Sequence, residues 1–320
     1  MSCTKSLFPE PVTSMQRCCV LEKKIHFAAI TLLVLAIVIV VLAISSSFSS
    51  REVEVRVSTT TSLYQTGLLE YLADKFRESY PNVRLAFIAV GTGRALKLAE
   101  QGDVCAVFVH APSLERQYLE RGVIEAGRIF AYNYFVIVGP LGDPADVKNA
   151  KNVIDAFRRI YEAGEKGIAK FVSRGDSSGT HVRELSLWRS AGVDPHGRTW
   201  YKETGLGMSE TLIVANEIEA YTLSDISTFL SLKKRGKIPT LEVLYGQDTE
   251  LINIYSAYLV KRCSGVQREY AEKFVDFVTS DEGQSLVASY GVDEFGKPLF
   301  KPATRDLQRL RAIWEKFARG

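Results

Sequence analysis

The chain has 320 residues, of which 46% are hydrophobic and 24% charged, and its formal net charge is +3. This composition excludes a disordered, collagen-like or disulfide-dense protein, and the length suggests two lobes with a full core each. After residue 50 the chain holds 36 basic and 35 acidic residues, so no basic field attracts nucleic acid nonspecifically. A single long apolar run excludes a multi-span transporter.

That apolar run, residues 27–44, reads FAAITLLVLAIVIVVLAI and carries no charge. A helix of this length spans about 27 Å, close to the bilayer core of about 30 Å. Basic residues precede the run, which places residues 1–24 in the cytoplasm. We therefore expect a cell-membrane anchor at residues 25–44, a polar linker at 45–52 and a binding domain on the extracellular side. A cleaved signal peptide is the alternative.

Cysteine and histidine usage gives no sign of a metal site. Cys105 and Cys263 are the only cysteines after the apolar run, and the sequence leaves open whether they pair. In the third expected strand, Cys105 is the kind of small side chain that packs in a core. The four histidines are scattered without metal-ligand spacing, so we expect neither a metal nor a cofactor.

The segment after the linker alternates strands and helices. Such an order is typical of a parallel sheet with helices on its faces. Strands are expected at 52–57, 83–90, 103–112, 130–140 and 253–260, and helices at 68–81, 94–102, 153–164, 270–291 and 303–318.

Residues 166–192 repeat the strand–loop–helix order. In this segment, and after the strands at 52–57 and 83–90, a short loop rich in hydroxyl groups opens directly into a helix. These loops are STTTS at 58–62, VGTGRAL at 90–96 and SRGDSSGTH at 173–181. Open α/β sheets bind ligands beyond the carboxyl ends of their strands, and helix N-termini there offer N–H groups to an anion. The pattern indicates an anion site, although single hydroxyl residues also cap helices for purely structural reasons.

From Ser58 to Pro140 the chain resembles the tungstate-binding proteins of TupA type, through STTTSLYQTGLLEYLADKF, AVGTGRALKLAEQGD, VFVHAP and AYNYFVIVGP. The likeness continues through SRGDSSGTHVRELSLW, WYKETGLGMSETL, AYTLSD and FVDFVTSDEGQSLVASYG, and spans residues 53–300. These proteins are extracytoplasmic receptors of ABC importers. The resemblance implies a two-lobed α/β periplasmic-binding fold of type II, each lobe a mainly parallel sheet flanked by helices.

In this chain the resemblance assigns residues 53–133 and 260–320 to lobe 1 and residues 134–259 to lobe 2. The lobes would be joined by crossing segments near 132–138 and 251–259, with the ligand held between them. The same resemblance implies ten ligand-binding residues: Thr60, Thr61, Ser62, Thr92, Gly93, Arg174, Ser178, Gly179, Thr180 and Tyr221.

Arg174 is the one charged residue that we expect to be indispensable, because its planar fork can hold two oxyanion oxygens. A purely structural salt bridge to Asp176 is the competing interpretation. Arg94 departs from the family pattern after GTG, where it either strengthens anion binding or points to solvent.

The sequence therefore predicts a non-enzymatic, monomeric receptor that binds tungstate and delivers it to an ABC permease with its ATPase. Molybdate, sulfate or phosphate is the alternative ligand, and a sensor signalling through residues 1–24 is also consistent with one chain. From another class, GDSSG at residues 175–179 fits the G-x-S-x-G motif of a serine hydrolase with Ser177 as nucleophile. That enzyme requires a later histidine, and His196 is the last in the chain.

Overall fold

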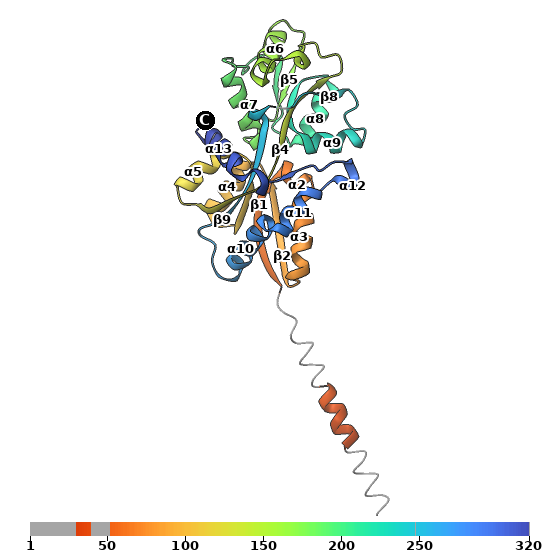
Figure 1. Ribbon diagram of the computed structural model, residues 1–320, viewed down its shortest axis with the longest axis vertical. Coiled ribbons are helices and arrows are strands. Elements are labelled where there is room, and N and C mark those ends of the chain that lie inside the picture. The colour runs from red at the N-terminus through yellow and green to blue at the C-terminus, as the bar shows by residue number, and fades with distance from the viewer. Residues whose placement is uncertain (1–29, 40–51, 247, 320) are drawn as a thin grey trace, which may run out of the picture. The chain divides into compact units, whose positions relative to one another are not determined.

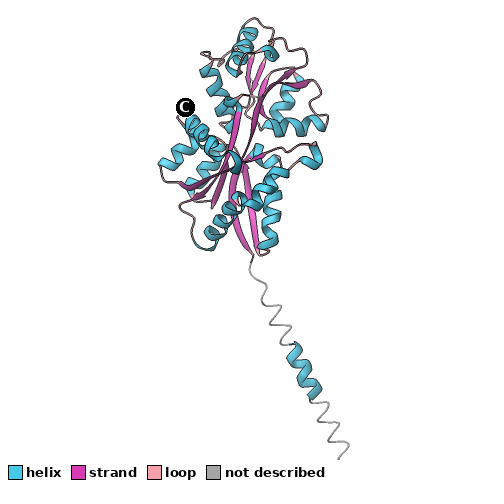
Figure 2. Ribbon diagram, viewed as in Figure 1, coloured by secondary structure: helices cyan, strands magenta, loops and turns pink. Residues whose placement is uncertain are grey.

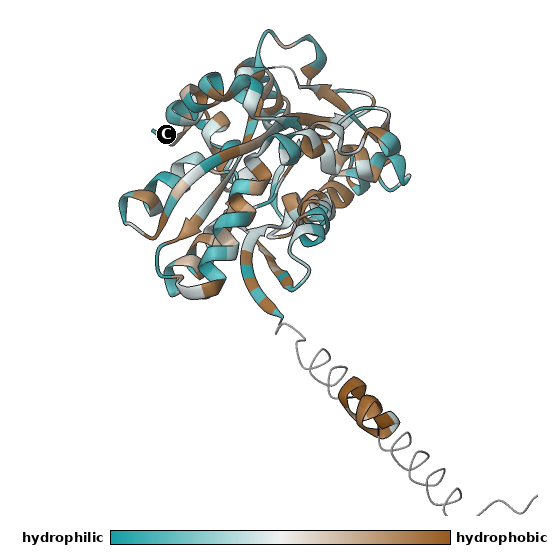
Figure 3. Cartoon of the chain, turned by 60° about the horizontal axis from the view of Figure 1, so that its bottom comes forward, coloured by the Kyte–Doolittle hydropathy of each residue, from teal (hydrophilic) through white to brown (hydrophobic). Residues whose placement is uncertain are grey.

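The computed structural model describes residues 30–39, 52–246 and 248–319. Residues 1–51 and residues 52–320 form two separate units. In the first unit, residues 30–39 are helical, apolar and exposed (Figure 3). Among the described residues no helix has both the length and the apolar character needed to span a membrane. The rest of the expected anchor, 25–44, and the linker, apart from Glu52, lie outside the described residues.

The second unit has the two-lobed α/β architecture that the resemblance implied (Figures 1 and 2). Its strands are β1 (Val53–Thr60), β2 (Val83–Val90), β3 (Ala106–Val109), β4 (Ile124–Pro140), β5 (Phe171–Ser173), β6 (Tyr201–Glu203), β7 (Thr222–Asp225), β8 (Leu241–Tyr245), β9 (Ile252–Val260) and β10 (Lys301–Pro302). Its helices are α2 (Thr61–Gln65), α3 (Leu68–Ser79), α4 (Thr92–Gln101), α5 (Pro112–Glu120), α6 (Val153–Glu165), α7 (Gly179–Ser190), α8 (Met208–Glu217), α9 (Ile226–Lys234), α10 (Gly265–Thr279), α11 (Asp281–Ser289), α12 (Val292–Phe295) and α13 (Leu307–Ala318).

One lobe is built on the strand order β10-β4-β9-β3-β1-β2. Apolar residues of β1, α3 and α10 form the core on one face, and α4 and α5 cover the other. In the other lobe β7 and β8 pair with the far half of β4, and β5 pairs with β6. Its cores lie beneath α6 and α7 and beneath α8 and α9.

The long strand β4 joins the two lobes. Up to Tyr134 it pairs with β9, and from Phe135 it pairs with β7, so the crossing lies between these two residues. Both halves are largely buried, which explains why this segment reads as a continuous apolar run.

Two sequence expectations need correction. The sheets are mixed rather than mainly parallel: β1 is parallel to β2 and β3, but β4 and β9 run antiparallel to their neighbours because they carry the chain between lobes. The lobe 2 boundary at residue 259 is also too late. All of β9 pairs with β3 or with the lobe 1 half of β4, so the return crossing ends near Ile252.

Cys105 and Cys263 form a disulfide, with their Cα atoms 5.1 Å apart. The bond ties the start of the third strand to the segment that follows β9, two parts of the chain 158 residues apart in sequence. Cys105 is therefore a cross-link and not simply a small core side chain. A structural disulfide is typical of proteins that fold in an oxidising compartment.

Candidate anion-binding site

The three hydroxyl-rich loops come together where the lobes meet. Thr60 caps α2, Gly91 precedes α4 and Ser178 caps α7. A Cβ placed on Gly91 would lie 3.2 Å from the Asp176 carbonyl oxygen, and one on Gly93 would lie 3.9 Å from the Ser177 carbonyl oxygen. Loops distant in sequence therefore pack against each other at two helix N-termini, where free N–H groups attract negative charge.

Residues 58–62 do not form the expected loop, because β1 runs to Thr60 and α2 begins at Thr61; this junction is held by its own hydroxyl groups. The Thr60 side chain accepts a hydrogen bond from the Leu63 amide at 3.2 Å and lies 3.4 Å from the Ser62 hydroxyl. Ser62 in turn lies 3.3 Å from His110 Nε2. Thr60 and Ser62 are buried, so these polar groups need partners within the protein.

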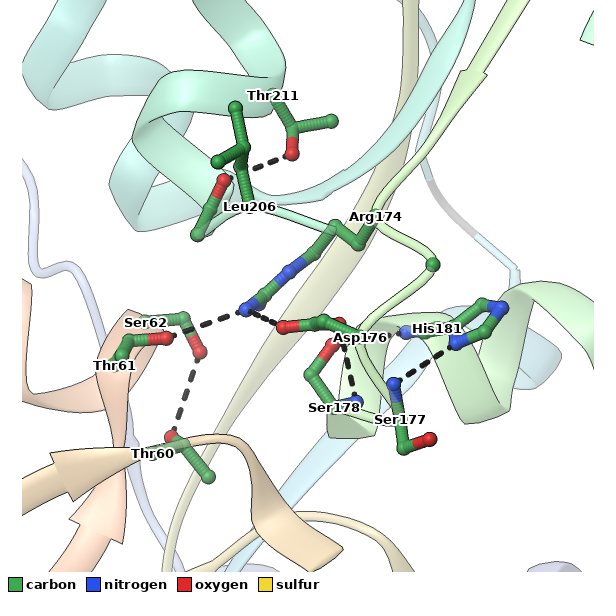
Figure 4. A network of polar contacts seen from close by, with 12 residues as sticks. Thr60, Thr61, Ser62, Arg174, Asp176, Ser177, Ser178, His181, Leu206 and Thr211 are labelled. Carbon is green, nitrogen blue, oxygen red and sulfur yellow. Dashed lines mark hydrogen bonds and ion pairs between the residues drawn. The ribbon is translucent and has the colours of Figure 1, made fainter. Parts of the chain in front are cut away.

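Arg174 enters the site from the other lobe, at the end of β5. Its Nη2 donates to Thr61 Oγ1 at 3.2 Å and to Asp176 Oδ2 at 2.5 Å (Figure 4). The side chain is only 1% exposed, yet Nε and Nη1 have no partner among the described residues. The salt bridge to Asp176 therefore exists, but it uses one nitrogen and leaves the others available.

The loop after Arg174 has a fixed and unusual backbone. Asp176 Oδ1 accepts from the Ser178 amide at 3.1 Å, and Ser178 Oγ accepts from the His181 amide at 3.3 Å. Gly175 has φ of 61° and Ser177 has φ of 56°, a left-handed conformation that is uncommon for a residue with a side chain. These bonds hold the N-terminus of α7 in the site.

The buried carboxyl group of Glu184 contacts the residue that precedes Arg174 and this loop. Glu184 on α7 accepts hydrogen bonds from Ser173 Oγ at 2.7 Å, Tyr201 Oη at 2.8 Å and Trp188 Nε1 at 3.0 Å. Burial raises the pKa of Glu184 to about 7, despite these three donors. Because Ser173 immediately precedes Arg174, this carboxyl group helps to set the direction in which the arginine leaves the strand.

Buried hydrogen-bond donors without partners are the most informative feature of the site. In the three hydroxyl-rich segments, the buried side-chain atoms that find no hydrogen-bond partner within the described part of the chain are Thr59 Oγ1, Thr92 Oγ1, Arg174 Nε, Arg174 Nη1, Thr180 Oγ1 and His181 Nε2. Such groups are rare in folded proteins, and leaving one unsatisfied costs about 1–3 kcal/mol or more. The cost indicates a ligand that supplies acceptors and little else, as a fully ionised oxyanion does.

The structure brings together nine of the ten residues expected here, through direct contacts or within the three loops: Thr60, Thr61, Ser62, Thr92, Gly93, Arg174, Ser178, Gly179 and Thr180. Tyr221 is not among them. Its hydroxyl donates to Asp143 and accepts from the Ala145 amide, both at 2.8 Å, and its ring lies in the lobe 2 core. Arg94 is exposed and forms no part of the cluster.

Sequence reasoning missed two residues that stand behind the site. His110 contacts Ser62, and Asn253 lies 2.9 Å from the other ring nitrogen of His110. The sequence could not predict their contact, because they lie at separate strands whose pairing the sequence does not reveal. Within residues 30–39, 52–246 and 248–319, no group of histidine, cysteine and acidic side chains could hold a metal ion.

Comparison with known proteins identifies the family of the chain. A family model of the PBP superfamily domain matches residues 46–282. The tungstate-binding protein TupA of Peptoclostridium acidaminophilum is 35% identical over 250 residues, which cover 77% of this chain and 84% of that protein. The chain belongs to the TupA family of the PBP superfamily.

Two solved structures share its fold. The structure of the tungstate ABC transporter from Geobacter sulfurreducens has 43% identity and a TM-score of 0.67, covering 75% of this chain and 100% of that one. The tungstate-binding protein TupA from Desulfovibrio alaskensis G20 has 38% identity and a TM-score of 0.66, covering 78% and 98%.

The geometry gives the hydrolase alternative no support. Ser177 is exposed, and its amide donates to His181 Nδ1 at 3.0 Å, so the hydrogen of that imidazole sits on Nε2 when the ring is neutral. A general base would need a free ring nitrogen near the serine hydroxyl. In this TupA-family chain the G-x-S-x-G motif forms a loop that presents amides and hydroxyls.

Proposed function

We propose that this protein is the extracytoplasmic receptor of an ABC importer and that it binds tungstate between its two lobes. The observation that carries the proposal is the set of buried, unpartnered donors on Arg174, Thr92 and Thr180, which come from both lobes. Tungstate is a tetrahedral dianion without a proton at neutral pH, so it uses donors alone. Family membership and the tungstate-binding relatives support the choice of anion.

The donor set is suited to such an anion energetically. Hydrogen bonds to a charged group contribute about 1.5–3 kcal/mol each, which can offset the desolvation of a buried dianion. Arg174 supplies the positive charge, and Asp176 keeps its guanidinium in place through Nη2. Both oxygens of Asp176 already accept a hydrogen bond, from Arg174 and from the Ser178 amide.

Binding in this site requires both lobes at once. Thr61 belongs to the first lobe and Arg174 to the second, and the Arg174 side chain donates a hydrogen bond to the Thr61 hydroxyl. Closure of the lobes around the anion by a hinge motion is the signal that we propose the permease reads. The receptor acts as a monomer, without catalytic activity or cofactor, and delivers the anion to the permease and its ATPase.

We further propose that residues 25–44 anchor the receptor in the cell membrane. The exposed, apolar helix at residues 30–39 supports this proposal, as does the uncharged run at 27–44. The disulfide between Cys105 and Cys263 fits a binding domain outside the cytoplasm. Fractionation of cells, followed by sequencing of the N-terminus of the membrane-bound protein, tests whether the segment is retained.

Titration calorimetry tests the proposed ligand. Residues 52–320, which form one compact unit, are freed of bound anion and titrated with tungstate, molybdate, sulfate and phosphate. Tight 1:1 binding of tungstate, with molybdate weaker, is the expected result. Equal binding of molybdate would broaden the ligand class, and no heat from any of the four anions would refute the site.

A further inference from the structure

A chain of buried hydrogen bonds runs from the anion site to the crossing strands. It contains Ser62, His110, Asn253, Asn133 and Ser227, none of which is more than 3% exposed. Asn133 on β4 and Asn253, the second residue of β9, face each other in the strand register. Of these residues only Ser62 belongs to the proposed anion site, so the roles of the other four need an explanation.

The far end of this hydrogen-bond network, at Leu299, determines which group donates and which accepts in every bond. The Ser227 hydroxyl donates to the Leu299 carbonyl oxygen at 3.0 Å, and a carbonyl oxygen can only accept. Ser227 Oγ therefore accepts from Asn133 Nδ2 at 3.0 Å. Asn133 then presents Oδ1 to Asn253 Nδ2, also at 3.0 Å, which turns Asn253 Oδ1 toward His110.

At the end next to the anion site, the hydrogen-bond network determines the tautomer of His110. Asn253 Oδ1 lies 2.9 Å from His110 Nδ1 and cannot donate, so Nδ1 carries the ring hydrogen. In a neutral ring Nε2 then holds a lone pair. Ser62 Oγ lies 3.3 Å from Nε2 and must donate to it.

The surroundings of His110 keep the ring neutral. The ring packs between Tyr255 and Phe135, and a Cβ on Gly179 of α7 would lie 2.7 Å from it. Arg174 and Asp176 are the charged groups that act on it, with opposite effects. Burial, aided by the charge of Arg174, lowers the pKa of His110 to about 4.

We propose that His110 is a positioning residue of the anion site: held as the Nδ1–H tautomer by Asn253, it accepts a hydrogen bond from the Ser62 hydroxyl, so that Ser62 has no hydrogen left to donate to the ligand. This inference rests on the proposed function, because it concerns the same site. The donors for a fully ionised oxyanion are then Arg174, Thr92 and Thr180, whose polar atoms are unpartnered. Ser62 sets the shape and polarity of the site without donating to the anion.

The same chain connects the site to the contact between the lobes. Ser227 stands at the start of α9 in lobe 2, and Leu299 precedes β10 in lobe 1. The fixed end of this hydrogen-bond network is therefore a bond between the two lobes, from Ser227 Oγ to the Leu299 carbonyl oxygen.

Nitrogen-15 NMR of the full-length protein labelled at histidine tests the tautomer directly. The His110 resonances are assigned by comparison with single substitutions of the other three histidines. We expect a protonated Nδ1 and an unprotonated Nε2 in the empty protein near neutral pH. Asn253 Nδ2 also donates to Tyr255 Oη at 2.7 Å, but a hydroxyl can equally donate. In Asn133→Leu, which removes the link to Ser227, we therefore expect a mixture of tautomers. A hydrogen on Nε2 in the wild-type protein would overturn the proposal.

A binding comparison tests the consequence for Ser62. Ser62→Ala should weaken tungstate binding less than about threefold, whereas Thr180→Ala should weaken it about tenfold or more, because only Thr180 donates to the charged ligand. Equal losses in the two variants would mean that Ser62 donates to the anion, and the proposal would be wrong. The NMR result does not depend on the anion, so failure of tungstate to bind, with the Nδ1–H tautomer present, would refute the proposed function alone.

Discussion

Arg174 is bound to Asp176 through one nitrogen only, with Nη2 2.5 Å from Oδ2, while its Nε and Nη1 remain buried and without partners in the described residues. A salt bridge that served only to shape the loop would leave no reason to bury two more donor nitrogens. The carboxylate fixes the guanidinium, and the free nitrogens are left for a ligand.

The first prediction concerns this pair. Arg174→Lys keeps the charge but loses the planar fork, so tungstate binding should weaken at least tenfold. Calorimetry of the variant measures the loss, with Arg94→Lys, an exposed arginine in the neighbouring loop, as the matched control. Unchanged affinity in Arg174→Lys would mean that the fork is not used.

Asp176→Ala should affect both binding and folding. Arg174 would lose its only carboxylate partner among the described residues, and breaking a buried ion pair costs about 3–5 kcal/mol. Asp176→Asn keeps an acceptor for the Ser178 amide and should cost less. Thermal unfolding of the two variants without ligand separates these cases, and equal melting temperatures in wild type and both variants would contradict the assigned role.

Gly179 gives a steric test of closure. A Cβ at this position would lie 2.7 Å from the His110 ring and from its backbone oxygen, so Gly179→Ala should keep the lobes apart. Tungstate affinity should fall, and small-angle scattering should show a larger radius of gyration with ligand present. Gly142→Ala, outside the site, is the control, since its Cβ would meet no atom within 4 Å and its φ is not in the left-handed region. A compact Gly179→Ala protein with normal affinity would rule out the contact as a closing point.

The raised pKa of Glu184 predicts that the stability of the folded protein depends on pH. Its pKa is raised from 4.5 to about 7 by burial, so between these values the folded protein holds a proton that the unfolded chain has released. Stability therefore falls as pH rises from 4.5 to 7, by about 3 kcal/mol from this group. Glu184→Gln mimics the protonated form and should remove that part of the dependence.

Thermal unfolding from pH 4.5 to pH 8 measures the difference. The melting temperature of Glu184→Gln relative to wild type should rise with pH across this interval. The comparison with wild type is needed because burial also raises the pKa of Glu115 and Asp225, which contribute with the same sign. A constant difference across the pH range would show that Glu184 does not titrate as described.

The disulfide should matter for stability and not for binding. Cys105 and Cys263 close a loop of 158 residues, and removing such a link costs about 2–5 kcal/mol. The double variant Cys105→Ser, Cys263→Ser should melt at a lower temperature. Its tungstate affinity should match wild type at a temperature where both are folded, and a large loss of affinity there would place the disulfide in the binding mechanism.

The amino-acid sequence was sufficient to predict the α/β class, most helices and long strands, and three hydroxyl-rich junctions between strand and helix, although the first of these, at residues 58–62, has no loop between β1 and α2. These features are local: they depend on the spacing of apolar residues and on cap residues such as Thr60 and Ser178, whose neighbours are close in sequence. The resemblance to TupA proteins supplied the ten candidate site residues. The structure gathers nine of them and places Tyr221 apart, with its hydroxyl bonded to Asp143.

Only the tertiary structure decided how these pieces act together. The pairing of Cys105 with Cys263, the antiparallel course of β9 and the partners of Arg174 each join residues that lie far apart in the chain. Hydrogen-bond direction is the clearest case, because the tautomer of His110 follows from a carbonyl oxygen at Leu299, four bonds away through three other residues. A pattern in sequence records which groups are present, whereas donors and acceptors are assigned only when the fold gives each buried group its partner.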